Sequence, residues 1–223
     1  MFEYKVKEAL KFEKSIKIID ALLRFNGLTN FSNIERTSGV KGGALKHHLN
    51  RLGKLGIVNS DLRGFYKLKY KGVFYTILNL KKPYTYLGLL GRRNNREEPE
   101  TLTALKLLKM EGIEYDRSYV ITTSKALGEW ENIDVVNCNF ILCSGDEISD
   151  VNALRSRVKS IVEDIIENYP LIMDCTGATK PATIAFYDIA SLYLIPLMYV
   201  TEDKKIKWII DLKSIVRKVK HEK

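Results

Sequence analysis

The sequence is poor in the residues that hold metals or build disulfide frameworks. It contains 3 cysteines and 3 histidines in 223 residues, with no CxxC pair and no Cys/His cluster at metal-ligand spacing. An odd, widely spaced set of cysteines excludes a disulfide scaffold, and we expect no structural zinc. Cys143 and Cys175 lie in apolar, strand-like runs, so we expect buried free thiols in a reducing compartment.

Long apolar segments are also missing. No run reaches the roughly 18 residues that a membrane-spanning helix needs. The stretch 1–17 mixes charged and apolar residues instead of forming the apolar core of a signal peptide. We therefore expect a soluble, cytoplasmic protein without a membrane partner. With 45% apolar residues the chain is too rich in core-forming side chains to be disordered.

Charge is distributed unevenly along the chain. Residues 1–83 carry 17 basic and 6 acidic side chains, a net of +11, whereas residues 84–201 carry a net of −6. The remaining 22 residues have a net of +4. A basic first third joined to an acidic middle predicts two modules with different partners, the first partner a polyanion. A solvated, lysine-rich surface of the kind found in thermophile proteins is the alternative.

The first module has the element order of helices followed by a hairpin. Apolar side chains at helical spacing predict helices over 14–25 and 41–55, with a short helix after Asn30 between them. Two apolar stretches around a polar turn predict a β-hairpin over 57–70. The core stripe of the third helix consists of Leu45, Leu49 and Leu52.

The opposite face of that third helix carries the candidate DNA-binding residues. It is almost free of acids, and a glycine pair at its start allows close approach of a phosphate. A basic side chain near the hairpin tip extends the same surface. The predicted DNA-binding set is Lys41, Lys46, His47, Asn50, Arg51, Lys54 and Arg63.

The segment 41–58 resembles the recognition helix of ArsR- and MarR-like regulators. The segment 66–72 (YKLKYKG) likewise resembles the Y-x-L-T-x-K-G run that closes their wing and opens a fourth helix, here over 73–80. The resemblance implies a winged helix-turn-helix that acts as a homodimer on double-stranded DNA, with the third helix in the major groove. It assigns base contacts to Lys46, His47, Asn50 and Arg51, and phosphate contacts to Lys54 and Arg63.

The second module alternates between strands and helices. Strands are predicted over 84–90, 119–122, 139–143, 171–175, 195–200 and 206–210, and helices over 97–110, 151–168 and 182–193. This alternation predicts βαβ units and a mainly parallel, Rossmann-like sheet. The predicted domains are a winged helix-turn-helix over 1–83, a nucleotide-sensing domain over 84–210 and a basic helix over 211–223.

Ligands of such sheets bind beyond the carboxyl ends of the strands. The clearest strand end is the segment 174–181 (DCTGATKP), where a strand meets a turn of small residues and a helix whose first turn holds Lys180 and Pro181. Backbone N–H groups, the positive end of the helix and the lysine together predict an anion site. The spacing is not that of a P-loop. Asp174, which precedes the turn, is expected to be a buried strand-end residue.

The same segment resembles the D-x-T-G-G-T-K-P signature of CARF (CRISPR-associated Rossmann fold) domains, with Ala178 in place of the second glycine. The strand end 89–92 and the element order are also similar. The resemblance implies a homodimer that binds cyclic oligoadenylate, the messenger of type III CRISPR effector complexes. The implied ligand-binding residues are Gly91, Arg92, Arg93, Thr176, Gly177, Ala178, Thr179 and Lys180.

Together these features predict a ligand-responsive, DNA-binding transcriptional regulator. We assign no catalytic residue, no metal and no cofactor, and expect cyclic oligoadenylate as the ligand. One alternative is a ring nuclease in which Lys180 stabilises charge during cleavage of the ring. Another is a regulator that senses a different nucleotide or anionic metabolite.

Overall fold

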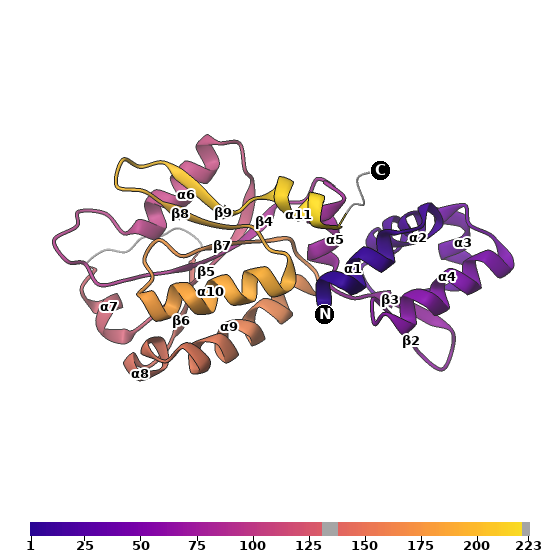
Figure 1. Cartoon of the computed structure of the whole chain (residues 1–223), viewed down its shortest axis with the longest axis horizontal. Coiled ribbons are helices and arrows are strands. Elements are labelled where there is room, and N and C mark those ends of the chain that lie inside the picture. Colours follow the sequence, from indigo (N-terminus) through magenta and orange to yellow (C-terminus); the bar gives the residue numbers. More distant parts are fainter. Residues whose placement is uncertain (131–137, 220–223) are drawn as a thin grey trace.

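The computed structural model describes residues 1–130 and 138–219. Within them, a six-stranded sheet with its helices forms one half of an elongated molecule, and a smaller group of helices with a three-stranded sheet forms the other (Figure 1). The fold is therefore of the mixed α/β class that the alternation of strands and helices predicts. None of the described helices is long and apolar enough to cross a membrane.

The smaller half has the element order of a winged helix-turn-helix. Its three strands are antiparallel and lie in the order β1-β3-β2. The short strand β1 had no sequence signal, because it has only two residues and pairs with β3 far along the chain. The elements are α2 (Glu13–Leu23), β1 (Thr29–Asn30), α3 (Phe31–Ser38), α4 (Gly42–Lys54), β2 (Val58–Ser60) and β3 (Phe65–Leu68).

Local chemistry explains the ends of α3 and the position of α4. The Asn30 side chain accepts a hydrogen bond from the backbone N–H of Asn33 and caps α3. Gly39 ends the helix in the left-handed conformation at φ 69°. Leu45, Leu49 and Leu52 are buried and fix the inner face of α4 against the core. The opposite face of α4, which carries Lys46, His47, Asn50 and Lys54, is exposed.

The larger half is built on a sheet with the strand order β6-β5-β4-β7-β8-β9. All neighbouring pairs are parallel except β8 and β9, which are antiparallel. Strands β5 and β6 extend the sheet from β4 toward one edge, and β7, β8 and β9 extend it toward the other. The topological switch point therefore lies between β4 and β7. The strands are β4 (Tyr84–Leu89), β5 (Tyr115–Thr122), β6 (Cys138–Leu142), β7 (Leu171–Asp174), β8 (Leu197–Val200) and β9 (Ile206–Ile210).

Helices cover both faces of this sheet. Helix α6 (Glu100–Met110) packs on one face, in a cluster that includes Tyr86 of β4. Helices α9 (Val151–Ile166) and α10 (Lys180–Tyr193) lie against each other on the opposite face, where Leu87 of β4 points. The alternation of Tyr86 and Leu87 between the two clusters follows the two-residue period of a strand buried on both sides.

Two short helices were not predicted. Helix α7 (Ser124–Gly128) follows β5, and α8 (Gly145–Ser149) precedes α9. Each has five residues, little more than one turn, so no apolar repeat is available to reveal it. Both begin at the carboxyl end of a strand, and the site described below depends on this placement.

Three further helices join the two halves: α1 (Phe2–Leu10), α5 (Lys71–Ile77) and α11 (Leu212–Val219). Helix α1 packs on α2, α10 and α11, and α5 packs on α9 and α11. The aromatic ring of Phe2 lies 5.3 Å from that of Tyr193 in α10, measured between centroids. We call this region, formed by α1, α5, α11 and the adjoining ends of α9 and α10, the seam.

The apolar core continues through the seam without a break. One cluster of buried side chains extends from α2 and α4 to α9 and α10. The change in composition predicts a boundary between modules at Pro83, but the apolar core does not divide there. The predicted terminal helix begins at Leu212 and packs on α1 and α5, and residues 220–223 lie outside the described part.

The tightest contact of the seam is between backbones. A Cβ at Gly72 in α5 would lie 1.8 Å from the carbonyl oxygen of Tyr169, in the loop after α9. Lys67 forms an ion pair of 2.6 Å with Glu167 on one side of this contact. On the other side, Lys82 donates a hydrogen bond of 2.8 Å to the carbonyl of Asn168. The loop after α9 is thus held from three positions in the first module.

Replacement of Gly72 by alanine should destabilise the whole protein. The added methyl group meets backbone atoms that cannot rotate away, so we expect Gly72→Ala to lower the free energy of unfolding in urea by about 3 kcal/mol. Gly43→Ala is the matched control, because a Cβ at Gly43 has no atom within 4 Å. It should stabilise α4 by about 0.5–1 kcal/mol. Equal effects of the two substitutions would contradict the seam contact.

Candidate functional site

A cavity of about 510 Å³ lies at the carboxyl ends of the parallel strands. Its walls come from the loops after β4, β5 and β6 and from the loop between β7 and α10. This is the edge of the sheet where the order of strands predicts a ligand site. The cavity lies beside the switch point between β4 and β7.

Two glycines bring the central loops together. A Cβ at Gly177 would lie 2.4 Å from the carbonyl oxygen of Leu89, and one at Gly91 would lie 3.0 Å from the carbonyl oxygen of Gly177. The close approach of the two strand ends therefore requires glycine at position 177 and favours it at position 91. The resemblance assigned these glycines to ligand contact; they line the cavity and also hold its loops in place.

Three hydroxyl groups line the cavity where helices begin. Thr123, Ser144 and Thr179 are the N-caps of α7, α8 and α10, and each accepts a hydrogen bond from a backbone N–H of its own helix. A hydroxyl that accepts in this way keeps its proton for another acceptor. The caps therefore both fix the loops and leave three donors available at the cavity wall.

The charges at the wall are positive. Arg92 and Lys125 line the cavity, and none of the described lining residues is acidic. Arg92 is paired at 2.7 Å with Glu129, which also accepts the backbone N–H of Arg93 at 3.1 Å. These contacts lower the pKa of the Glu129 carboxyl, chiefly through the hydrogen bond from Arg92. An anion in the cavity would compete with Glu129 for Arg92. Lys125 forms no ion pair with any of the described residues.

The structure brings together half of the predicted ligand-binding residues. Gly91, Arg92, Gly177 and Thr179 line the cavity, whereas Arg93, Thr176, Ala178 and Lys180 do not. The Thr176 hydroxyl bonds with Asp174 and accepts the N–H of Val200 at 2.8 Å, so its hydrogen-bonding capacity is used inside the protein. Lys180 is exposed in the first turn of α10, next to the lining residue Thr179.

Other lining residues were absent from the predicted set. They include Thr123, Ser124 and Lys125 after β5 and Ser144 and Gly145 after β6. Their position at strand ends rich in hydroxyls and glycine was the available signal. The sequence could not reveal that α7 and α8 turn these segments toward the loop after β7.

Asp174 has a structural role beneath the cavity. It is fully buried, accepts a hydrogen bond of 2.5 Å from the Tyr86 hydroxyl and another of 2.9 Å from the backbone N–H of Thr176. Burial raises the pKa of its carboxyl above the usual range, against the opposing effect of these hydrogen bonds. Asp174 thus ties β4 to the start of the loop after β7, as the expectation of a buried strand-end residue requires. Within the described residues, no group of three or more histidine, cysteine or acidic side chains gathers as a metal site.

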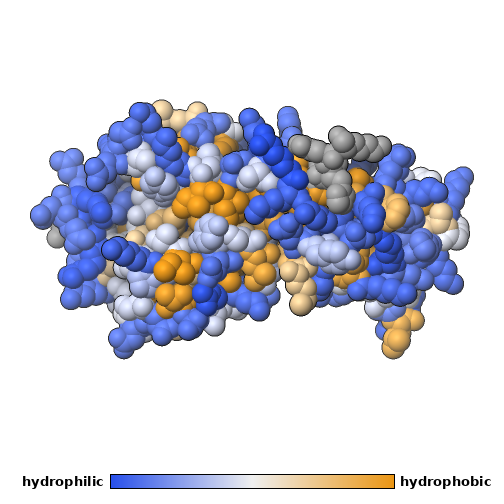
Figure 2. All heavy atoms as spheres, in the orientation of Figure 1, coloured by the Kyte–Doolittle hydropathy of each residue, from blue (hydrophilic) through white to orange (hydrophobic). Residues whose placement is uncertain are grey.

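The candidate DNA surface lies at the far end of the smaller half. Lys41, Lys46, His47, Asn50 and Lys54 are exposed on or just before α4. Arg63 is exposed near the tip of the hairpin between β2 and β3, the wing. Asn50 and Lys54 also line a hollow of about 320 Å³ between α4 and the wing. Figure 2 shows the surface of this half as mostly hydrophilic.

Arg51 departs from the predicted DNA surface. Its guanidinium donates to the carboxylate of Glu8 at 2.8 Å and to the carbonyl of the same residue at 2.6 Å. It also stacks over the ring of Phe12, 4.3 Å from the centroid. In this structure Arg51 therefore connects α1 to α4 and does not lie free for the base contact that was predicted. The partner lies 43 residues away, so helical spacing could not reveal it.

The N-terminus of α4 is also occupied. The backbone N–H of Gly42 donates to the Glu35 carboxylate at 2.7 Å. The sequence interpretation assigned this position to a phosphate, but an acid of the protein already caps the helix. Phosphate contact at this surface thus depends on the exposed lysines and Arg63.

The fold and the cavity define an α/β protein with a strand-end cavity and a winged-helix element order. No family model matches the sequence, and no curated protein matches it. Among solved structures, the chain is similar to Enterococcus italicus Csm6 bound to cyclic hexa-2'-fluoro-hexa-dAMP, with 12% identity and a TM-score of 0.44. The match covers 60% of this chain and 39% of Csm6, so the chain spans well under half of that protein.

The raised pKa of Asp174 gives stability a dependence on pH with a defined sign. The folded state keeps the proton to higher pH than the unfolded chain, in which an aspartate titrates near pH 3.9. The free energy of unfolding therefore decreases as pH rises from the unfolded-state pKa toward the raised pKa of the folded state. Asp174→Asn removes the titration, so urea unfolding from pH 4 to pH 7 should show the variant gaining stability relative to the wild type.

Asp203→Asn is the control for that experiment. Asp203 has a lowered pKa, chiefly because Lys205 donates a hydrogen bond to it, and it is exposed. Its replacement should not reproduce the gain with rising pH. A parallel pH profile for the wild type and Asp174→Asn would show that Asp174 is not held in its buried, hydrogen-bonded position.

Proposed function

We propose that this protein is a homodimeric, DNA-binding transcriptional regulator whose strand-end cavity binds cyclic oligoadenylate. The observation that carries the proposal is the cavity itself, with its glycine-packed loops, three hydroxyl donors, two cations and no acidic side chain among the described lining residues. Such a wall suits the phosphates and ribose of an oligonucleotide. The resemblance of the segment 174–181 to CARF domains supplies the identity of the ligand.

The size of the cavity supports a dimer. About 510 Å³ has room for one nucleotide and is too small for a ring of four or more adenylates. A ring therefore needs two cavities that face each other across a two-fold axis. Lys180, Ile184 and Tyr187 share the outer face of α10, where Ile184 is 50% and Tyr187 48% exposed. Apolar surface is visible over α10 in Figure 2, and we assign this face to contact between protomers.

Lys180 has a place in this arrangement. It does not line the cavity of its own protomer, but it begins the helix whose outer face carries the apolar pair. Contact between two copies of α10 brings both Lys180 side chains toward the axis. There they face the phosphates of a ring shared by two subunits, which restores the role that the resemblance gives this lysine.

The seam supplies a physical connection between the two sites. The loop between β7 and α10 forms a wall of the cavity, and the other end of α10 packs on α1. Helix α1 in turn holds Arg51 of α4 through Glu8. A shift of α10 on ligand binding therefore reaches the DNA-binding helix through packed side chains and one ion pair. In a dimer such a shift changes the spacing of the two α4 helices.

Binding to DNA should depend on salt through the exposed lysines of α4. Each phosphate contact contributes about 0.9 to the slope of log affinity against log salt. Fluorescence anisotropy with a labelled duplex over a salt series should show that Lys54→Ala lowers this slope by about one. Lys109→Ala on α6 is the matched control, since Lys109 is exposed on the other half. Identical salt slopes for the two variants would show that Lys54 does not contact a DNA phosphate.

Ligand and DNA should alter each other's affinity by one common factor. Calorimetry with cyclic tetraadenylate and cyclic hexaadenylate identifies the ring that binds. Lys125→Ala should weaken that binding about tenfold, because a charge-assisted hydrogen bond to phosphate is lost. Anisotropy titrations with DNA are then repeated with the ligand at saturation, again with Lys109→Ala as the control.

Each result of that titration separates one part of the proposal from the others. Equal DNA affinity with and without bound ligand refutes the coupling. If neither ring binds, cyclic oligoadenylate is refuted as the ligand. Chromatography of the incubated ligand detects linear products, which would identify the ring nuclease alternative. Binding of mononucleotides at the same affinity as the rings would favour a sensor of another nucleotide.

A further inference from the structure

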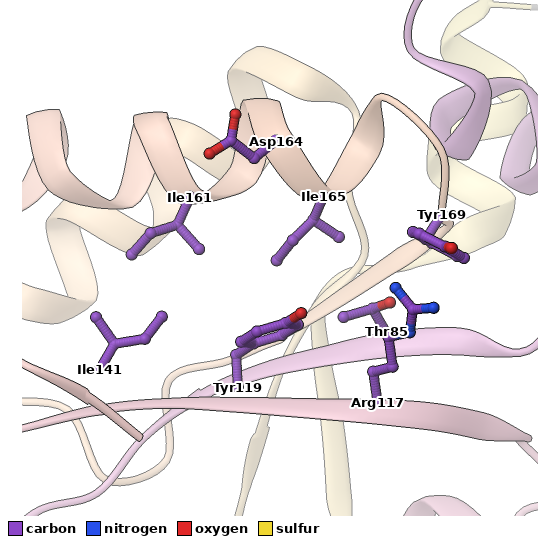
Figure 3. Close-up of a pocket in the computed structure, with 8 residues that line it drawn as sticks. All are labelled: Thr85, Arg117, Tyr119, Ile141, Ile161, Asp164, Ile165 and Tyr169. Atoms are coloured by element: carbon purple, nitrogen blue, oxygen red, sulfur yellow. The ribbon is translucent and has the colours of Figure 1, made fainter. Parts of the chain in front are cut away.

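A second cavity, separate from the strand-end site, lies between α9 and the strands β5 and β6. It has a volume of about 290 Å³ (Figure 3). Figure 3 shows Ile161 and Ile165 pointing down from α9, with Ile141 opposite them and the ring of Tyr119 along the floor. This volume accepts a group the size of one ring and is too small for a nucleotide. The main part of the cavity is apolar.

The inner end of this cavity holds a polar group without a partner. Thr85 at the start of β4 is fully buried, and its hydroxyl oxygen has no hydrogen-bond partner among the described residues. The backbone N–H of the same residue donates to Pro170 at 2.7 Å, so only the side chain is unsatisfied. Buried hydroxyls normally have partners, because an unmade hydrogen bond is costly. The Thr85 side chain borders the cavity, but its hydroxyl oxygen is covered, so a hydrogen bond to an occupant requires a small movement of this side chain.

A guanidinium lies beside that hydroxyl. Arg117 extends from β5 toward Thr85 in Figure 3 and stacks over the ring of Tyr169, 4.0 Å from the centroid. Its N–H groups have no acceptor among the described residues, although stacking fixes the plane of the group. The single acid at the cavity, Asp164, is exposed and points away from Thr85 and Arg117. This end of the cavity therefore presents one buried hydroxyl and one oriented cation that is exposed to solvent.

We propose that this cavity binds a small organic monocarboxylate. Its carboxylate would receive hydrogen bonds from Arg117 and Thr85, and its apolar body would lie between Tyr119 and the isoleucines of α9. One guanidinium and one hydroxyl match the two oxygens of a carboxylate, whereas a phosphate dianion needs more donors than this end supplies. The proposal does not depend on the ligand of the strand-end cavity.

The occupant would lie against the seam. Tyr169, which stacks on Arg117, is the residue whose carbonyl packs against Gly72 of α5. The Lys82 ammonium lies 4.6 Å from the centroid of the same ring. An acid held by Arg117 therefore contacts the segment that joins the two modules.

Fluorine NMR with 4-fluorobenzoate as the probe and 4-fluorobenzamide as its neutral analogue tests the site. The wild type should bind the acid in preference to the amide. Arg117→Gln should weaken binding of the acid about tenfold, since a charged hydrogen bond is lost. Asp164→Asn should strengthen it, because a negative charge near the mouth is removed. Lys109→Gln, on the opposite face of the sheet, should leave it unchanged.

Thr85→Val is the second, isosteric variant. It should weaken binding of the acid severalfold, because one hydrogen bond to the carboxylate is lost. It should also raise the melting temperature of the protein without probe, because the unpaired hydroxyl is removed. A loss of stability in the absence of probe would show that the hydroxyl already has a partner and would overturn the proposal. Equal binding of acid and amide, or binding that Arg117→Gln leaves intact, would overturn it as well.

A competition experiment separates this proposal from the proposed function. Cyclic oligoadenylate at saturation should not displace 4-fluorobenzoate, because the two cavities have no lining residue in common. Displacement would place the acid in the strand-end cavity and overturn the proposal. Failure of cyclic oligoadenylate to bind would refute the proposed function and leave the acid titration unaffected.

Discussion

The structure depends above all on the contact between α5 and the loop after α9. Gly72 lets the two backbones approach more closely than any side chain permits, and a continuous apolar core surrounds that contact. A first module attached through a free linker would move independently of the sheet. Here the two halves are packed as one body, so a change at one end must be accommodated at the other.

The parts of the fold that the sequence predicts are those with strong local signals. Helices α4 and α10 have long apolar stripes, and the parallel strands have short apolar runs, so both kinds of element were placed within a few residues. Tertiary contacts decided the rest. Helices α7 and α8 are too short for a periodic pattern, and Arg51 is bound by Glu8 of α1 instead of lying on the predicted DNA surface. Neither effect has a local signature in the chain.

The strand-end site shows the same division. The turn of small residues after β7 was identified from the segment 174–181, but its residues have different roles in space. Thr179 lines the cavity, while the Thr176 hydroxyl forms hydrogen bonds with Asp174 and Val200 inside the protein. Arg92 lines the cavity but forms an ion pair with Glu129, so its positive charge is partly balanced. A motif therefore locates a site and leaves the assignment of roles to the geometry.

The packing of α1 against α11 has a consequence for how the protein is made. Helix α1 is translated before the sheet, whereas α11, its partner in the seam, is translated only after the entire sheet. Native pairing of such distant segments is slow, and nascent chains expose apolar surface until it is complete. A chain released prematurely lacks the helix that covers α1 and α5. Translation of α11 is therefore required before α1 and α5 acquire their final packing partner.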